Sequence, residues 1–351
     1  MNQKLTGKQY TLLASMLFGM FFGAGNLIFP IILGAKAGAS LVPALLGMLI
    51  TAVGMPLLGI VALGVSRSSG LMQMSGRVAK WYSYFFTCAL YLTIGPFFAI
   101  PRCAATSFTM GIAPLVSGSH TVPQAIFTTL FFAAVLFFAL RPNNIMNSIG
   151  KYLNPIFLIC LGILVVAALL DPIQSVGSVA ASGAYADNAF STGFLQGYDT
   201  LDALASLAFG IIVVNVIKEM GVEEPGAIAK NTIKSGVFSM VLMTVIYALI
   251  AIVGAQSYGL YADQLGEPSF NGGNAFAIVA QHYLGKAGMI VLALTVTFCC
   301  MKTAIGLVTA CADTFSVMFP RSLSYRSWAI VFTAFSLLVS NIGLSKIISF
   351  S

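Results

Sequence analysis

Two short stretches of this sequence combine residue types that suit ligand binding with a position inside an apolar segment. Gly23-Ala24-Gly25-Asn26 interrupts the first long apolar run, with Pro30 shortly after it, and the stretch 196–202 interrupts a second run near the middle of the chain. Glycine and proline break helices, and a backbone N–H or C=O group freed inside a bilayer finds no water to bind. Matched breaks in two halves of a membrane protein indicate the binding site of a secondary transporter, so the expected chemistry is recognition of a small polar molecule.

The first break offers groups that suit a charged ligand. We expect the N–H groups of Gly23, Ala24 and Gly25 to hold a carboxylate at a helix N-terminus, with the side-chain amide of Asn26 beside them. The alternative is a glycine kink that lets helices pack closely, with Asn26 serving only as a helix cap. The polar content of the second break favours the binding site over this alternative.

The second break contains Gly197 and a run of polar side chains, Tyr198, Asp199, Thr200 and Asp202. An acid within a membrane span costs about 2.5–3.5 kcal/mol on insertion scales, so it usually faces a pathway or a partner. The alternative is that this stretch lies closer to the outer surface, which leaves Asp199 in water. Asp202 leads straight into a helical run and is the stronger candidate for the membrane interior.

Three further charged residues lie within or at the end of apolar runs. Lys302 either pairs with an acid, replaces a bound cation, or extends its ammonium to the membrane surface, and its central position favours the first two. Arg102 is either an outer gate that pairs with an acid such as Asp199 or an interfacial anchor. Asp313 is expected at the cytoplasmic end of its span.

The elements that carry these residues are membrane-spanning helices. The chain of 351 residues is 58% hydrophobic and only 8% charged, and its mean hydropathy is +0.95, which excludes a soluble globular protein. The apolar runs have the length of spanning helices rather than of barrel strands. The predicted spans are 9–34, 40–65, 81–109, 122–140, 149–170, 192–217, 235–257, 287–318 and 327–345, and residues 346–351 begin a tenth.

The basic residues predict the orientation of these helices. With the N-terminus inside, only Lys36, Lys286 and Lys346 fall outside, and the remaining lysines and arginines other than Arg102 and Lys302 fall in cytoplasmic segments. The net charge of +7 is spread over several segments, which argues against nucleic-acid binding. All six cysteines lie in apolar runs without metal-ligand spacing. No cleavable signal sequence is expected.

The chain reads as a single polytopic domain over 1–351. If each break marks the first helix of a repeat, repeat one covers about 9–170 and repeat two covers about 192–351, inverted in the membrane because the number of spans per repeat is odd. The second repeat is then incomplete, so the chain is expected to be truncated, with low stability and little transport. Residues 218–234 predict a short cytoplasmic helix, and residues 258–286 predict a hinge followed by a short outer helix that is either a lid or an ordinary loop helix.

Several spaced motifs in this sequence resemble those of the branched-chain amino acid system II carriers, which are bacterial symporters for leucine, isoleucine and valine. The similarity runs along essentially the whole chain. The motifs are Phe22-Gly23-Ala24-Gly25-Asn26-Leu27-Ile28-Phe29-Pro30, Gly95-Pro96 through Ile100-Pro101-Arg102, Gly193-Phe194 through Gly197-Tyr198, Asp202-Ala203-Leu204, and Ser340-Asn341-Ile342-Gly343-Leu344-Ser345.

This resemblance implies an all-α, leucine-transporter-like fold with two inverted five-helix repeats, broken helices one and six, and alternating access in a bacterial cytoplasmic membrane. It implies branched-chain amino acids as substrates and Na⁺ or H⁺ as the coupling ion, without another cofactor. The implied substrate residues are Gly23, Ala24, Gly25, Asn26, Gly197 and Tyr198, with Asp202 a weaker transfer. The implied cation residues are Gly19, Phe22, Cys299, Lys302 and Thr303.

Two positions depart from the family's pattern. Lys302 stands where an uncharged residue is usual, and Thr109 stands where an acid is common. An ammonium at the cation site brings in the alternatives of a proton-coupled carrier, an exchanger of other neutral amino acids, or an inactive carrier. A channel is the alternative from another class, but the spans carry isolated polar spots rather than continuous polar stripes. An enzyme is disfavoured because His120 and His282 fall in outer loops and no nucleophile–base constellation is visible.

Overall fold

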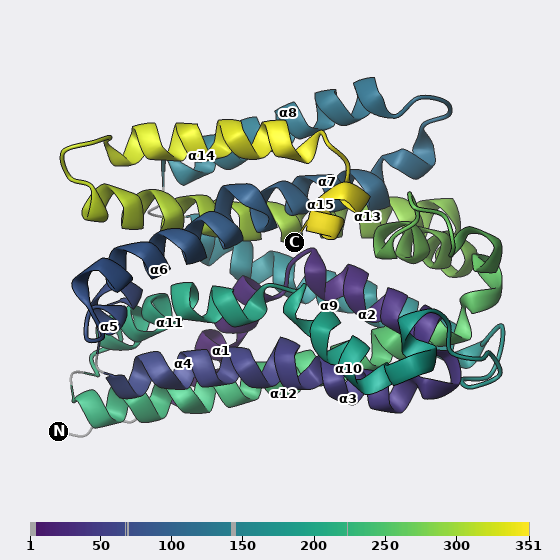
Figure 1. Cartoon of the computed structure of the whole chain (residues 1–351), viewed down its shortest axis with the longest axis horizontal. Helices are drawn as coiled ribbons and strands as arrows, with labels where there is room; N and C mark the ends of the chain where they lie inside the picture. Colours follow the sequence, from purple (N-terminus) through teal and green to yellow (C-terminus); the bar gives the residue numbers. More distant parts are fainter. Residues whose placement is uncertain (1–4, 67, 69, 142–144, 223, 351) are drawn as a thin grey trace.

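The computed structural model describes residues 5–66, 68, 70–141, 145–222 and 224–350. Within these ranges every regular element is a helix (Figure 1). Several begin with the capping that their sequences predict. At the first helix, the hydroxyl of Thr6 and the side chain of Gln9 form a reciprocal capping box.

Both predicted breaks are confirmed. The first apolar run forms α1 (Gly7–Phe21) and α2 (Gly25–Ala37), and the second forms α10 (Ala184–Tyr198) and α11 (Asp202–Glu219). Figure 1 shows that α1 leads into α2 in one direction, whereas α10 leads into α11 in the opposite direction. The two broken helices therefore run antiparallel, as inverted repeats require.

The other helices surround this central pair. They are α3 (Leu41–Leu49) and α4 (Met55–Ser66), joined by the π-helical turn Ile50–Gly54; α5 (Leu71–Ser75); α6 (Lys80–Leu92) and α7 (Ala99–Gly111), joined by the π-helical turn Thr93–Phe97; α8 (Thr121–Ala139); α9 (Ile145–Leu170); α12 (Pro225–Gln256); α13 (Gly272–Met318); α14 (Tyr325–Ser340); and α15 (Leu344–Phe350). Short 3₁₀ turns occupy parts of the loops.

The prediction of a separate short helix within 218–234 is wrong in its extent. Its start is as expected: the carboxylate of Glu224 accepts hydrogen bonds from the N–H groups of Gly226 at 3.0 Å and Ala227 at 2.7 Å, and a proline occupies the first helical position. No residue after this start breaks the backbone, however. The helix continues to Gln256, so the cytoplasmic turn and the following span form one element, α12.

The outer segment 258–286 contains the expected short helix, but residues 271–274, where the glycines predict a hinge, form the capped start of α13 instead. Asn271 caps the start of α13 in a capping box with Asn274, and Gly285 kinks the same element with φ +61° and ψ −168°. This left-handed φ suits glycine and separates an outer part, 272–284, from the long part, 286–318. The predicted span 327–345 is too long, because α14 ends at Ser340 and α15 bends away from it by 109°.

Close contact between backbones joins α2 to α12. A Cβ atom at Gly34 would lie 1.9 Å from the carbonyl oxygen of Ala251, and one at Gly254 would lie 2.2 Å from the carbonyl oxygen of Ile31. Only glycine leaves room for this approach, which is typical of helices packed within a membrane.

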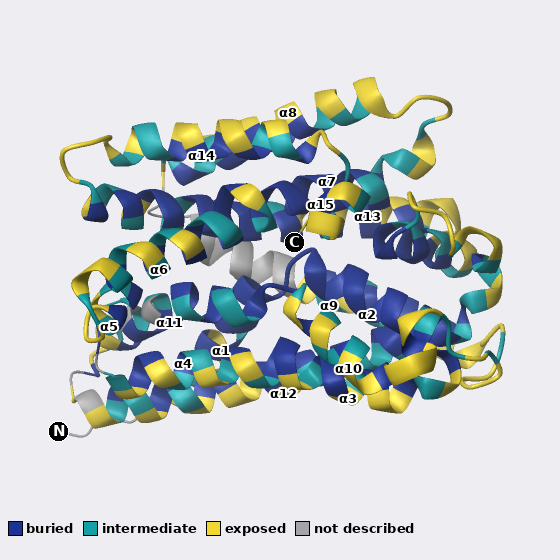
Figure 2. Ribbon diagram, viewed as in Figure 1, coloured by how far each residue is buried: buried dark blue, intermediate teal, exposed yellow. Residues whose placement is uncertain are grey.

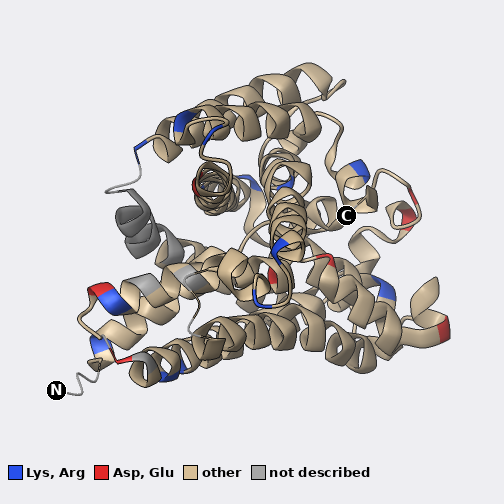
Figure 3. Cartoon of the chain, turned by 60° about the vertical axis from the view of Figure 1, so that its left-hand side comes forward, with Lys and Arg blue, Asp and Glu red and all other residues tan. Residues whose placement is uncertain are grey.

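The outer surface of the bundle is apolar. Five described helical segments are long and apolar enough to cross a membrane, or seven if each bent pair counts as one span. Figure 2 shows the central helices buried, with exposed residues along α8 and α14, and large side chains such as Leu58, Ile126 and Leu130 are more than half exposed. In Figure 3 the charged residues are sparse and lie mostly at helix ends and in loops. Such a surface suits contact with lipid.

Candidate functional site

The two breaks meet around a small cavity of about 30 Å³. The first break contributes Gly23, Ala24, Gly25 and Asn26, and the second contributes residues 200–202. Leu201 is the one non-glycine residue with positive φ, at +65°, in the described part of the chain. A leucine in the left-handed region is strained, and such strain is usually retained where the surrounding structure needs that backbone shape.

A hydrogen-bonded group of side chains joins three helices at this cavity. Asn26 donates from Nδ2 to Oδ2 of Asp202 over 2.6 Å, and its own Oδ1 accepts from the N–H of Gly23 at 2.9 Å. The hydroxyl of Tyr247, on α12, donates to the same Asp202 oxygen over 2.9 Å and contacts the Asn26 amide. All three side chains are buried. Because the acid is hydrogen-bonded, it can remain inside the membrane region.

Tyr247 is the member of this group that sequence analysis missed. It lies in an apolar run without a glycine, proline or charged residue beside it. An isolated tyrosine in such a run gives no sign of whether its hydroxyl points inward or toward the lipid headgroups. Only the contact between α12 and the two breaks reveals its partner.

Arg102 lines the cavity from α7. Its side chain is 2% exposed, so the prediction of an interfacial anchor is wrong. Nη1 donates to the carbonyl oxygen of Asp199 at 2.6 Å, and Nη2 donates to the carbonyl oxygen of Thr200 at 3.0 Å. The expected contact with Asp199 therefore exists, but it uses the main chain rather than the carboxylate. The guanidinium also lies 5.2 Å from the ring centroid of Phe29.

The absence of a side chain at Gly25 lets the start of α2 approach both Arg102 and the second break. A Cβ atom at this position would lie 3.1 Å from Nη2 of Arg102 and 3.3 Å from Cα of Thr200. The start of α2, the second break and the guanidinium are thus in close contact. This relationship supports a functional reading of the first break beyond a simple packing kink.

Two of the predicted substrate residues lie away from the cavity. A Cβ atom at Gly197 would lie 1.9 Å from Oγ1 of Thr51, so this glycine packs against the neighbouring helix. Tyr198 is 39% exposed, and its ring stacks edge-on against Phe194. The structure does not bring either residue to the cavity lining.

The predicted cation residues lie partly together. The thiol of Cys299 donates to the carbonyl oxygen of Phe22 over 3.3 Å, and the hydroxyl of Thr303 donates to the carbonyl oxygen of Cys299 over 3.3 Å. Thr303 also lines the central cavity. Lys302 is 8% exposed on the same helix, and Gly19 is buried within α1. The break between α1 and α2 therefore contacts α13 at Phe22. A cation-binding role for these residues stays a prediction.

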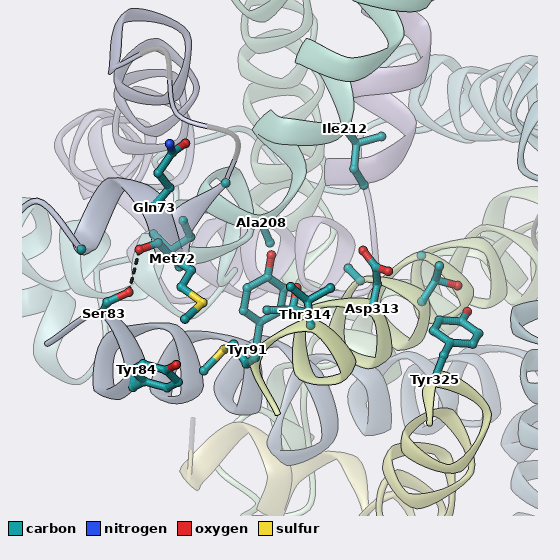
Figure 4. A pocket seen from close by; sticks show the side chains of 18 of the residues that line it. Met72, Gln73, Ser83, Tyr84, Tyr91, Ala208, Ile212, Asp313, Thr314 and Tyr325 are labelled. Atoms are coloured by element: carbon teal, nitrogen blue, oxygen red, sulfur yellow. Dashed lines mark hydrogen bonds between the residues drawn. The ribbon is translucent and has the colours of Figure 1, made fainter. Parts of the chain in front are cut away.

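A second cavity, of about 900 Å³, lies at the end of the molecule that holds α5 and the N-terminus (Figure 1). Tyr91, Asp313, Thr314 and Tyr325 are among its lining residues (Figure 4). Asp313 is exposed to this cavity, in keeping with its predicted place at the end of its span.

The two cavities follow the same helices. On α11, Ala205 and Phe209 line the small cavity, and Ala208 and Ile212 line the large one. On α13, the small cavity is lined by Thr303 and Leu307, and the large one by residues from Gly306 onward. The large cavity thus approaches the breaks from one side. One sequence signal for this cavity was not used. Helical spacing places Gly306, Ala310, Asp313 and Val317 on one face of the helix, which is the face that lines the large cavity.

Comparison with known proteins gives consistent results. The family model described as branched-chain amino acid transport protein matches residues 6–351. The chain is 51% identical over 356 residues to the branched-chain amino acid permease BrnQ of Lactobacillus delbrueckii subsp. lactis, covering 100% of this chain and 78% of that protein. It is 38% identical over 351 residues to the BrnQ permease of Escherichia coli strain K12, covering 100% of this chain and 77% of that protein.

The fold is similar to that of MhsT in a crystal structure with L-phenylalanine, with a TM-score of 0.67 at 15% identity, covering 99% of this chain and 81% of MhsT. The predicted leucine-transporter-like fold is confirmed by this likeness. The relatives are transporters rather than enzymes, and the apolar helices make this a multi-pass membrane protein. With a family model that matches nearly its whole length, the chain belongs to the branched-chain amino acid transport protein family.

Proposed function

We propose that this protein takes up leucine, isoleucine and valine by alternating access, driven by a Na⁺ or H⁺ gradient. The observation that carries the proposal is the cavity between the two breaks, whose lining combines polar groups with apolar side chains. The names of the relatives support the substrate class. The two breaks support the carrier mechanism, because such sites serve alternating access in secondary transporters.

The substrate would lie across this cavity. The N–H groups of Ala24 and Gly25 suit its carboxylate, whereas the N–H of Gly23 already donates to Asn26, and the Asn26–Asp202 pair suits its ammonium. An aliphatic side chain would contact the apolar wall, which consists of Met20, Phe21, Ile94, Ala99, Ala205, Phe209 and Leu307. A volume of about 30 Å³ holds only about one water molecule, so the helices must separate to admit an amino acid.

The protein is proposed to lie in a bacterial cytoplasmic membrane with its N-terminus inside. The excess of lysine and arginine in the segments on that side supports this orientation. The large cavity then opens to the cytoplasm. This arrangement suits a state that has released its substrate inward.

The coupling ion is proposed to act near Gly19, Phe22, Cys299, Lys302 and Thr303. The contact between the Cys299 thiol and the Phe22 carbonyl supports a site between α1 and α13. A buried ammonium at Lys302 favours H⁺ coupling or exchange, because a fixed positive charge disfavours a second cation nearby.

Uptake of labelled leucine into proteoliposomes tests this function, with the chain extended to the length of its relatives, such as the one of which it covers 78%. The purified protein is compared with Lys302→Thr and with Lys286→Thr, a control that removes an exposed lysine. We expect concentrative uptake that collapses when the driving gradient is removed, and a changed ion requirement only in Lys302→Thr. Uptake that needs Na⁺ in all three proteins contradicts the role of Lys302. Absence of uptake under either gradient contradicts the carrier function.

A further inference from the structure

The small cavity carries two buried groups of opposite charge. Arg102 on α7 is 2% exposed, and Asp202 at the start of α11 is 4% exposed. Both line the cavity, yet their recorded hydrogen bonds go to different partners. Burying a charge in a membrane protein costs several kcal/mol, so each of these groups calls for an explanation.

Arg102 is held in place by neutral groups. Both acceptors of its guanidinium are main-chain carbonyls, those of Asp199 and Thr200. A guanidinium has five N–H donors in a planar fork, and these two bonds use two of them. The remaining donors match a carboxylate, which guanidinium groups bind through two parallel hydrogen bonds. The carbonyls thus fix the direction of the fork without neutralising its charge.

The neighbourhood of Arg102 also favours an anion. Nη2 lies so close to the start of α2 that a Cβ atom at Gly25 would be only 3.1 Å from it. α2 has 13 residues, and no side chain caps its first N–H groups. The positive end of this helix and the guanidinium therefore face the same small space, where their effects on a carboxylate add.

The other side of the cavity suits a cation. The Asp202 carboxylate is positioned by Asn26 and Tyr247, which both donate to its Oδ2. These donors fix the carboxylate but add no positive charge. Arg102 and Asp202 attract each other, and a bound zwitterion would set its ammonium beside the acid and its carboxylate beside the guanidinium.

We infer that Arg102 binds the α-carboxylate of the transported amino acid and that Arg102 and Asp202 together select a zwitterion. Arg102 is then a specificity-determining residue of the site. Because the same guanidinium holds the carbonyls of the second break, a bound carboxylate also ties α7 to that break. This inference rests on the proposed function, since it names the groups that recognise the proposed substrate.

Ligand binding to the purified protein in nanodiscs tests the inference. The ligands are L-leucine, L-leucinamide, which keeps the shape and the ammonium but lacks the carboxylate charge, and 4-methylpentanoate, which lacks the ammonium. The variants are Arg102→Gln and Asp202→Asn. Arg141→Gln serves as the matched control, because Arg141 is exposed and stacks on Phe137 at the end of α8.

We expect the native protein and Arg141→Gln to prefer leucine strongly over leucinamide. In Arg102→Gln the dissociation constant of leucine should rise about 10- to 100-fold, the range for loss of charge-assisted hydrogen bonds, while that of leucinamide stays within about threefold. Asp202→Asn should instead lose the preference of leucine over 4-methylpentanoate. A purely structural role of Arg102 would weaken leucine and leucinamide equally and would overturn the inference.

Arg102→Lys provides a second test if Arg102→Gln does not fold. Lysine keeps the positive charge but lacks the fork, so the preference for leucine over leucinamide should fall about tenfold without vanishing. An unchanged preference contradicts the inference. A native protein that binds no branched-chain amino acid contradicts the proposed function itself, whereas native binding with an unaltered preference in the Arg102 variants contradicts only the role of Arg102.

Discussion

The hydroxyl of Tyr247 donates a hydrogen bond of 2.9 Å to Oδ2 of Asp202, a residue of another helix 45 positions earlier in the chain. Asn26 donates to the same oxygen from a third helix, 176 positions before Asp202. One carboxylate therefore joins α2, α11 and α12. These helices should move together during transport, while their contacts with α7 and α13 change.

Replacing Tyr247 by phenylalanine should weaken this junction. The change removes one of the donors to a buried carboxylate, so the free energy of unfolding should fall by about 1–2 kcal/mol. Thermal unfolding in detergent measures the effect. Tyr283→Phe is the matched control, because it loses an exposed bond of 2.9 Å to the carbonyl oxygen of Asp171 and should change stability little. Equal effects of the two changes would contradict the structural importance of the Asp202 junction.

Tyr198→Phe should leave leucine binding within about twofold of the native value. The structure places this side chain 39% exposed and away from the cavity, whereas the family resemblance implies a role in the substrate site. Equilibrium binding of labelled leucine separates these expectations. A loss of tenfold or more in affinity would mean that Tyr198 turns into the site in a state other than the one seen here.

Gly254→Ala should separate α2 from α12. The new Cβ atom would lie 2.2 Å from the carbonyl oxygen of Ile31, and neither backbone has room to yield. Overpacking of this kind costs about 1–3 kcal/mol. Gly162→Ala is the control, because a Cβ atom there meets nothing within 4 Å and alanine favours a helix. Denaturation midpoints in detergent should fall for the first variant only. A stable Gly254→Ala protein would rule out tight contact of the two helices.

A thiol probe should reach the large cavity from one side of the membrane. Thr309→Cys lies in the cavity lining, whereas Ile126→Cys is 58% exposed on the outer surface of α8. Cys88 and Cys160, which are partly exposed, are first replaced by alanine. A charged methanethiosulfonate should modify position 309 from the side that holds the N-terminus and should react slowly at position 126, because the lipid excludes it. Modification of position 309 only from the opposite side would reverse the proposed orientation.

The sequence predicts the breaks well because their signal is local. Glycine, proline and polar residues within an apolar run disrupt a helix wherever the run is placed, so the interruptions at Phe22–Ala24 and at residues 199–201 follow from composition. The same reasoning predicts a hinge near Asn271, but there the structure has the capped start of α13, and the kink lies at Gly285. The start of α12 is also local, since Glu224 and Pro225 form a recognisable helix beginning.

The features that sequence analysis missed depend on contacts between distant segments. Tyr247 becomes informative only when α12 packs beside Asp202. The partner of Arg102 could not be predicted, because a carbonyl oxygen is present at every residue and the sequence favours an acid such as Asp199 instead. The sequence predicted two elements where the structure has the single helix α12. The polar start and the apolar span differ in composition, but both adopt the same helical backbone.

The separation of Asn26 and Asp202 also sets the order in which the site is completed during synthesis. At about 5–20 residues per second, the ribosome delivers Asp202 roughly 10–35 s after Asn26, and Tyr247 follows later still. Throughout this interval the side-chain amide of Asn26, in the first break, lacks the Asp202 carboxylate to which it donates in the folded protein. The residues proposed to bind the ligand therefore include some of the first to leave the ribosome, yet their arrangement is finished only when the last of the three helices has entered the membrane.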